Sequence, residues 1–174
     1  MPKQEDIAIK NNIMQNIQLL PTKDIKQISH VIIDYDHGSI GSVHENALPA
    51  SVWNELGDVE TKKLLKKAKT QNKPYFIIIN PAWENNKPSQ YTIFHEVGHV
   101  VFYSLPKGET PERLFWVKHT NIKDISHKGT QEQVESGRGS DVLEYFADHY
   151  ARYHTNQPIP KEEKDWFDKR YNKP

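Results

Sequence analysis

Apolar residues recur at helical spacing near the start of the chain. Four of them stand three or four positions apart: Ile9, Ile13, Ile17 and Leu20. Residues with this spacing share one face of a helix. Pro21 follows directly, and proline cannot continue the helical hydrogen-bond pattern. The pattern therefore predicts an amphipathic helix that ends before Pro21.

Two later runs have the β-branched and aromatic composition of strands, residues 30–35 and residues 74–80. The second run is apolar throughout its middle, which predicts a buried strand. It is also a candidate sheet edge to which an extended peptide could add. Between the two strands we expect a glycine-containing loop at residues 36–46, a short helix at residues 52–56, and a Lys-rich helix that Asp58 caps and that ends near Thr70.

The second half of the chain reads as helices separated by polar loops. Ser89 has the position and chemistry of an N-cap, ahead of an apolar helix that ends near Ser104. Residues 112–125 are weakly helical, residues 127–139 form a polar loop, residues 140–154 form another helix, and residues 161–171 form the last one. We therefore expect an α+β fold dominated by helices, in a single domain spanning residues 1–174, with an N-terminal half at 1–80 and the chemistry at 88–171.

Composition excludes several classes of protein. The chain has 174 residues, enough for one domain with a hydrophobic core. Basic and acidic residues both number 23, and this balance argues against a nucleic-acid partner, which selects for basic surfaces. No stretch has the roughly 18 apolar residues of a membrane helix. The chain has no cysteine, which excludes disulfides, zinc–thiolate sites and cysteine nucleophiles, and leaves nine histidines as candidates for metal chemistry. We expect a monomer.

The first twenty residues mix charged side chains with isolated isoleucines and lack the continuous apolar stretch of a signal peptide. Two locations therefore stay open. The absence of cysteine favours a secreted protein whose signal has been removed, and a cytoplasmic protein is the alternative.

The pentapeptide at residues 95–99, His-Glu-Val-Gly-His, is an HExxH motif. On a helix, His95 and His99 lie four residues apart and share a face, so both imidazoles can bind one cation. Zn²⁺ suits this arrangement, since it takes histidine nitrogen in a tetrahedral shell. Glu96 is rotated by one position and can take a proton from a metal-bound water. The apolar neighbours predict a buried helix, in which two histidines without a ligand would be costly.

Two histidines and a water leave one coordination position. A third histidine in an HExxHxxGxxH pattern is excluded, because Phe102 and Leu105 stand where the glycine and histidine would be. Glu144 and Asp148 again lie at i and i+4 on a predicted helix. Glu144 could complete a His₂Glu shell, and Asp148 could accept the N–H of a zinc-bound imidazole and fix its tautomer. The alternative is two surface carboxylates.

The two motifs together resemble a known group. HEVGH followed by ExFADxYA is similar to gluzincin-type zinc metallopeptidases, and Gly137-Arg138 ahead of residues 144–150 is similar to the catalytic domain of anthrax lethal factor and to the Pro-Pro endopeptidases. The resemblance covers roughly residues 91–171. It implies a zincin-like domain with a small sheet, an HExxH active-site helix, one Zn²⁺, His95, His99 and Glu144 as ligands, and Asp148 as their partner.

One position departs from that family. Its members place a tyrosine about seven residues before the glutamate ligand, where it hydrogen-bonds the oxyanion of the tetrahedral intermediate. Here Gly137, or Ser136 with one extra loop residue, stands in its place. Five other residues are candidate oxyanion donors: Tyr103, His127, Tyr145, His149 and Tyr153.

Three functional hypotheses follow. The first is a zinc-dependent endopeptidase acting on a protein or peptide substrate, with Glu96 as general base. The second is a cytoplasmic peptidase of the ImmA/IrrE type acting on a repressor, since its ExxANxFA-like motif is close to residues 144–151. The third is a catalytically weak, toxin-like or binding domain that contains zinc, which the missing tyrosine favours.

Overall fold

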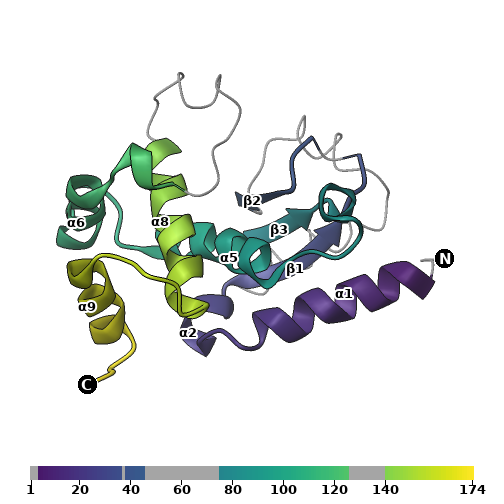
Figure 1. The fold of residues 1–174 in the computed structure, drawn as a ribbon, viewed down its shortest axis with the longest axis horizontal. Helices are drawn as coiled ribbons and strands as arrows, with labels where there is room; N and C mark the ends of the chain where they lie inside the picture. Colours follow the sequence, from purple (N-terminus) through teal and green to yellow (C-terminus); the bar gives the residue numbers. More distant parts are fainter. Residues whose placement is uncertain (1–3, 37, 46–74, 126–139) are drawn as a thin grey trace.

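The computed structural model describes residues 4–36, 38–45, 75–125 and 140–174 (Figure 1). The fold is α+β and dominated by helices, as the sequence predicts, and the sheet of the described residues has three strands. The helices expected at residues 52–56 and 58–70 and the loop expected at residues 127–139 lie outside the described residues. No helix of the described segments is long and apolar enough to cross a membrane.

The sheet has the order β1-β3-β2. Its strands are β1 (Ile28–Ile33), β2 (Gly41–Glu45) and β3 (Tyr75–Ile79). β3 pairs with β1 in parallel and with β2 antiparallel, and all five of its residues are buried. The predicted strands at 30–35 and 74–80 are confirmed. The prediction that the second of them is a sheet edge is wrong, because β3 is the central strand of the described sheet.

β2 lies where the sequence predicts a loop, so that prediction is also wrong. Its sequence, GSVHE, has a single aliphatic residue and no alternating apolar pattern. The strand conformation comes instead from pairing: Val43 stands opposite Ile77 in the antiparallel register, and Gly41 stands opposite Ile79. Edge strands are commonly short and polar, which limits pairing with other chains.

In the view of Figure 1, helices lie below the sheet and to the left of it. The predicted N-terminal helix is confirmed as α1 (Gln4–Ile17), and its predicted apolar residues are buried. The other helices are α2 (Thr22–Ile25), α5 (Gln90–Ser104), α6 (Pro111–His119), α8 (Ser140–His154) and α9 (Lys161–Arg170), with 3-10 turns η1 (Pro81–Glu84) and η2 (Ile122–Asp124). Ser89 caps α5 as predicted, since its hydroxyl accepts from the Thr92 N–H at 3.1 Å.

α5 is the central element of the core. Its residues from Thr92 to Phe102 are all buried, because it packs against α1, the sheet and α8. Phe146 and Tyr150 of α8 are fully buried, as are Trp116 of α6 and Phe167 of α9. These aromatic side chains pack α6, α8 and α9 together on the side of α5 that lies away from β1 (Figure 1). This packing fixes α8 across α5 and so places residues 144–151 beside the HExxH motif.

A buried carboxylate near the start of the chain is hydrogen-bonded to residues near its end. Asp24 of α2 accepts hydrogen bonds from the hydroxyls of Tyr150 and Tyr171, at 2.9 and 2.6 Å, and from Arg170 at 2.8 Å. With three donors, one of them cationic, the buried charge of Asp24 is compensated. The network holds α2 against α8 and the C-terminal end of α9.

Candidate metal centre

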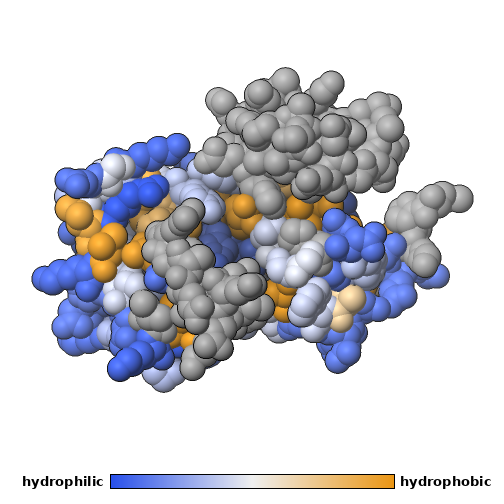
Figure 2. All heavy atoms as spheres, turned by 90° about the horizontal axis from the view of Figure 1, so that it is seen from above, coloured by the Kyte–Doolittle hydropathy of each residue, from blue (hydrophilic) through white to orange (hydrophobic). Residues whose placement is uncertain are grey.

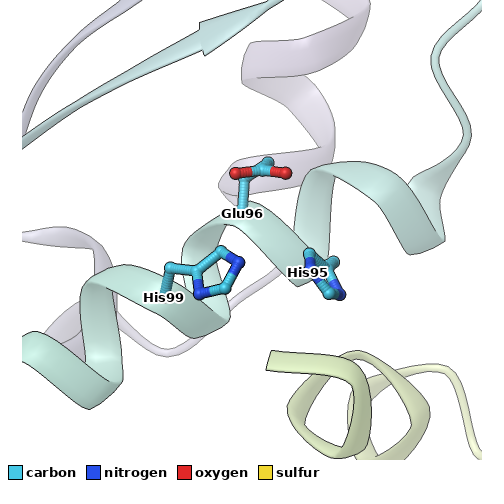
Figure 3. A group of neighbouring side chains, drawn as sticks. All are labelled: His95, Glu96 and His99. Carbon is cyan, nitrogen blue, oxygen red and sulfur yellow. The ribbon is translucent and has the colours of Figure 1, made fainter. Parts of the chain in front are cut away.

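α5 brings together the three polar residues of the HExxH motif. His95, Glu96 and His99 each offer a ligand atom, and these atoms lie within 4.8 Å of one another. The two imidazole rings have their centroids 4.8 Å apart and stand nearly perpendicular. Figure 3 shows the two imidazoles leaving α5 on one side and the Glu96 carboxylate leaving it on another. The predicted arrangement of one shared histidine face, with Glu96 beside it, is present.

α8 adds Glu144 to this group. Its Oε2 lies 3.0 Å from His95 Nε2, and its Oε1 lies 3.2 Å from His99 Nε2. One carboxylate therefore faces the Nε2 atom of each histidine, although Glu144 lies 45 residues after His99 in the chain. Two imidazole nitrogens and one carboxylate form a donor set that suits a tetrahedral Zn²⁺ with a fourth position free for water.

The three side chains differ in exposure. The side chains of His95 and His99 are only 7% and 11% exposed, whereas the side chain of Glu144 is 40% exposed. The group therefore opens to solvent on the α8 side. The space-filling view shows a hydrophilic hollow near the middle of one face, with hydrophobic atoms beside it (Figure 2).

Burial and charge shift the ionisation of these residues. Burial raises the pKa of Glu96 to about 7, with a further contribution from the neighbouring Glu144 carboxylate and an opposing one from His99. Burial acts against ionised His99, but its contacts with Glu144 outweigh that effect and raise its pKa. Burial also acts against ionised Glu144, and its hydrogen bonds with both histidines outweigh it and lower its pKa. Glu144 is thus held as a carboxylate, the form that binds a cation.

Asp148 lies one turn after Glu144 and is fully buried. Its Oδ2 is 2.9 Å from Arg152 Nη2, and Arg152 Nη1 in turn is 3.1 Å from Asp124 Oδ1. Asp148 is therefore held in an ion-pair network that joins α8 to η2. Its expected role as acceptor from a zinc-bound imidazole stays a prediction.

Three of the predicted oxyanion donors belong to α8 and contact residues of α9 or η2. The hydroxyl of Tyr145 donates to Glu163 at 2.8 Å, and the hydroxyl of Tyr153 donates to Asp168 at 2.7 Å. His149 is fully buried, with Nδ1 2.7 Å from Glu163 Oε1. The sequence did not predict this polar contact between α8 and α9, because Glu163 is one of many charged residues in α9, which suggests an exposed helix.

The other two candidates have different positions. The ring of Tyr103 stacks on Tyr75 of β3 with centroids 6.0 Å apart. His127 lies outside the described residues. The identity of the oxyanion donor stays a prediction.

Tyr91 is a residue beside the group that sequence reasoning missed. It lies one turn before His95, and the two ring centroids are 6.1 Å apart. Its hydroxyl is buried and has no hydrogen-bond partner among the described residues. The i−4 spacing from the first motif histidine was the signal that could have identified it.

Comparison with known proteins adds no relative: no protein-family model, no curated protein and no solved structure matches the chain. The residues of the group and their contacts are therefore the basis for any functional conclusion.

Proposed function

We propose that the protein is a zinc-dependent endopeptidase. The observation that carries the proposal is the position of Glu144, whose two carboxylate oxygens face the Nε2 atoms of His95 and His99 at 3.0 and 3.2 Å. This convergence completes a His₂Glu donor set beside a buried glutamate. The resemblance of both motifs to gluzincin-type metallopeptidases supports the same activity.

His95, His99 and Glu144 would hold one Zn²⁺. When bound, the ion polarises a carbonyl oxygen and lowers the pKa of a coordinated water towards about 7. The donors suit zinc because the ion binds histidine through neutral imidazole nitrogen, and because contacts with the two histidines keep the pKa of the Glu144 carboxylate low. The exposed side of Glu144 leaves room for water and substrate, which favours an open catalytic site over a closed structural one.

Glu96 would act as general base and then as proton donor. Burial raises its pKa to about 7, and a general base works best when its pKa lies near the working pH. The carboxylate would take a proton from the attacking water and pass it to the amine of the departing peptide. A base with an ordinary carboxylate pKa would hold that proton less well for the second transfer.

The substrate would be an extended peptide chain. β2 is the edge strand on one side of the described sheet, and it packs against α5, which carries the motif. An extended peptide can add to an exposed sheet edge through main-chain hydrogen bonds, with limited dependence on its sequence. β2 replaces β3 as the candidate edge.

Glu96→Gln tests the proposal. Gln has nearly the same shape but cannot take a proton, so the variant should keep one zinc per chain and lose about 10²–10⁴-fold in the rate of peptide-library hydrolysis. Glu109→Gln, at an exposed position, is the matched control and should keep full activity. Full activity in Glu96→Gln would contradict the mechanism. A wild-type protein that binds one zinc and hydrolyses nothing would support the zinc-containing binding domain.

A further inference from the structure

Gly41, the first residue of β2, lies directly against the side chain of Glu96. A Cβ atom at position 41 would stand 2.6 Å from Glu96 Oε1, 2.7 Å from Cδ and 2.8 Å from Cγ. Non-bonded carbon atoms approach to about 3.5–4.0 Å. Any side chain at position 41 would therefore occupy the space of the glutamate side chain.

The requirement for glycine at this position is steric. Among the described glycines only Gly108 has a positive φ, of 85°, so the backbone of Gly41 is open to other residues. Only glycine lets the strand backbone come this close to Glu96, because any Cβ would overlap the glutamate side chain. The space left by the missing side chain is occupied by the carboxylate.

The strand backbone is fixed on both sides of Gly41. Gly41 stands opposite Ile79 in the β2–β3 ladder, and the Asn80 N–H donates to the Ile40 carbonyl at 3.0 Å. The Ser39 hydroxyl donates to the Gly41 carbonyl at 2.9 Å. The backbone at Gly41 is therefore rigid compared with the glutamate side chain that packs against it.

Packing is what orients the carboxylate. Glu96 is 3% exposed, and its Oε2 has no hydrogen-bond partner among the described residues. A carboxylate on a side chain with three rotatable bonds would otherwise sample several rotamers. The backbone of Gly41 stands close to the end of the Glu96 side chain and so limits the rotamers that it can adopt.

We propose that Gly41 is the positioning residue for Glu96, so that the edge strand sets the orientation of the general base. The inference rests on the proposed function, and it adds a residue that carries no functional group. Displacing a catalytic group by about 1 Å can cost roughly 10²-fold in rate.

Gly41→Ala and Gly38→Ala form a matched pair for the test. A Cβ at Gly38 would meet nothing within 4 Å, although Gly38 lies only three residues earlier. Gly41→Ala should lower kcat about 10²-fold, with KM changed less than about twofold and one zinc still bound. Gly38→Ala should match wild type. An unchanged kcat in Gly41→Ala overturns the proposal, and so does a loss expressed in KM alone, because that would mark a substrate subsite.

A thermal-stability cycle with Glu96→Ala tests the contact independently of activity. Because the added methyl meets the flexible end of a side chain, Gly41→Ala should fold and lose only about 2–4 °C in Tm. That loss should vanish in the Glu96→Ala background, where the obstructing atoms are gone. An equal loss in both backgrounds overturns the proposal. If wild type hydrolyses no peptide, the proposed function and the positioning role both fail, and the cycle still decides whether the two residues are in contact.

Discussion

Gly98 of α5 lies directly on the backbone of Ala147 in α8. A Cβ at Gly98 would stand 2.8 Å from Ala147 Cα and 3.1 Å from the Ala147 carbonyl oxygen. The two helices thus come close together at a place where both residues are small. Gly98 is flanked by the motif residues of α5, and Ala147 follows Glu144 by three positions. The close approach is what lets the Glu144 side chain reach both histidines.

Gly98→Ala should therefore destabilise the protein. In an ordinary helix interior the change would stabilise by about 1 kcal/mol. Here the methyl meets backbone, which cannot move aside as a side chain can, and overpacking costs about 1–3 kcal/mol. We expect a net loss of up to about 2 kcal/mol in the free energy of unfolding, measured by urea denaturation without metal, and weaker zinc binding in a competition titration.

Gly38→Ala serves again as the control, because its Cβ would meet nothing within 4 Å. It should change neither stability nor zinc affinity. A stabilised Gly98→Ala variant with unchanged zinc affinity would show that the helix crossing has room to spare, and that Glu144 is positioned in some other way.

Glu144→Gln should weaken zinc binding by at least about 10²-fold, because the amide has no charge to offer the cation. Asp141→Asn, one turn earlier on the same helix, removes the same charge from α8 and should change zinc affinity less than about twofold. Isothermal titration with Zn²⁺ on both variants distinguishes ligation from general electrostatic attraction. Equal losses in the two variants would argue against Glu144 as a ligand.

The parts that the sequence predicted are those that depend on local spacing. Helical spacing alone places His95 and His99 on one face, and the same rule places Glu144 and Asp148 together. The position of Glu144 opposite the histidines depends on how α8 crosses α5, which helical spacing does not predict. The resemblance of the motifs implied that Glu144 is a ligand, but it gave no geometry. β2 could not be predicted, because pairing with β3 makes it a strand and its own residues do not. The contact of Gly41 with Glu96 joins residues 55 positions apart, and glycine carries no side-chain pattern to indicate it.

Tyr91→Phe should raise the free energy of unfolding by about 1 kcal/mol. The Tyr91 hydroxyl is buried and has no hydrogen-bond partner among the described residues, and a buried polar group left unpaired costs about 1–3 kcal/mol. Tyr153→Phe is the matched control. It removes a hydroxyl that donates to Asp168 at 2.7 Å, and it should destabilise by about 1 kcal/mol instead. Urea denaturation of the metal-free proteins compares them, and destabilisation of both variants would mean that the Tyr91 hydroxyl has a polar partner.

Glu96 should make the metal-free protein less stable as the pH rises. Burial raises the Glu96 pKa from 4.5 to about 7. Between these two values the folded state binds a proton that the unfolded state has released. Folding therefore favours protonated Glu96, and the contribution of Glu96 to stability is greatest below about pH 4.5 and is lost as the pH rises through 7. The same sign applies to His99, whose pKa is also raised.

Glu96→Gln isolates the contribution of Glu96, because glutamine does not ionise while His99 and Glu144 are kept. With chelator present, the free energy of unfolding of wild type should fall by up to about 3 kcal/mol more than that of Glu96→Gln between pH 5 and pH 8. Parallel pH profiles for the two proteins would show that Glu96 titrates as an ordinary carboxylate. Since zinc needs neutral imidazoles, added Zn²⁺ should stabilise both proteins increasingly as the pH rises, opposite to the trend of the metal-free wild type.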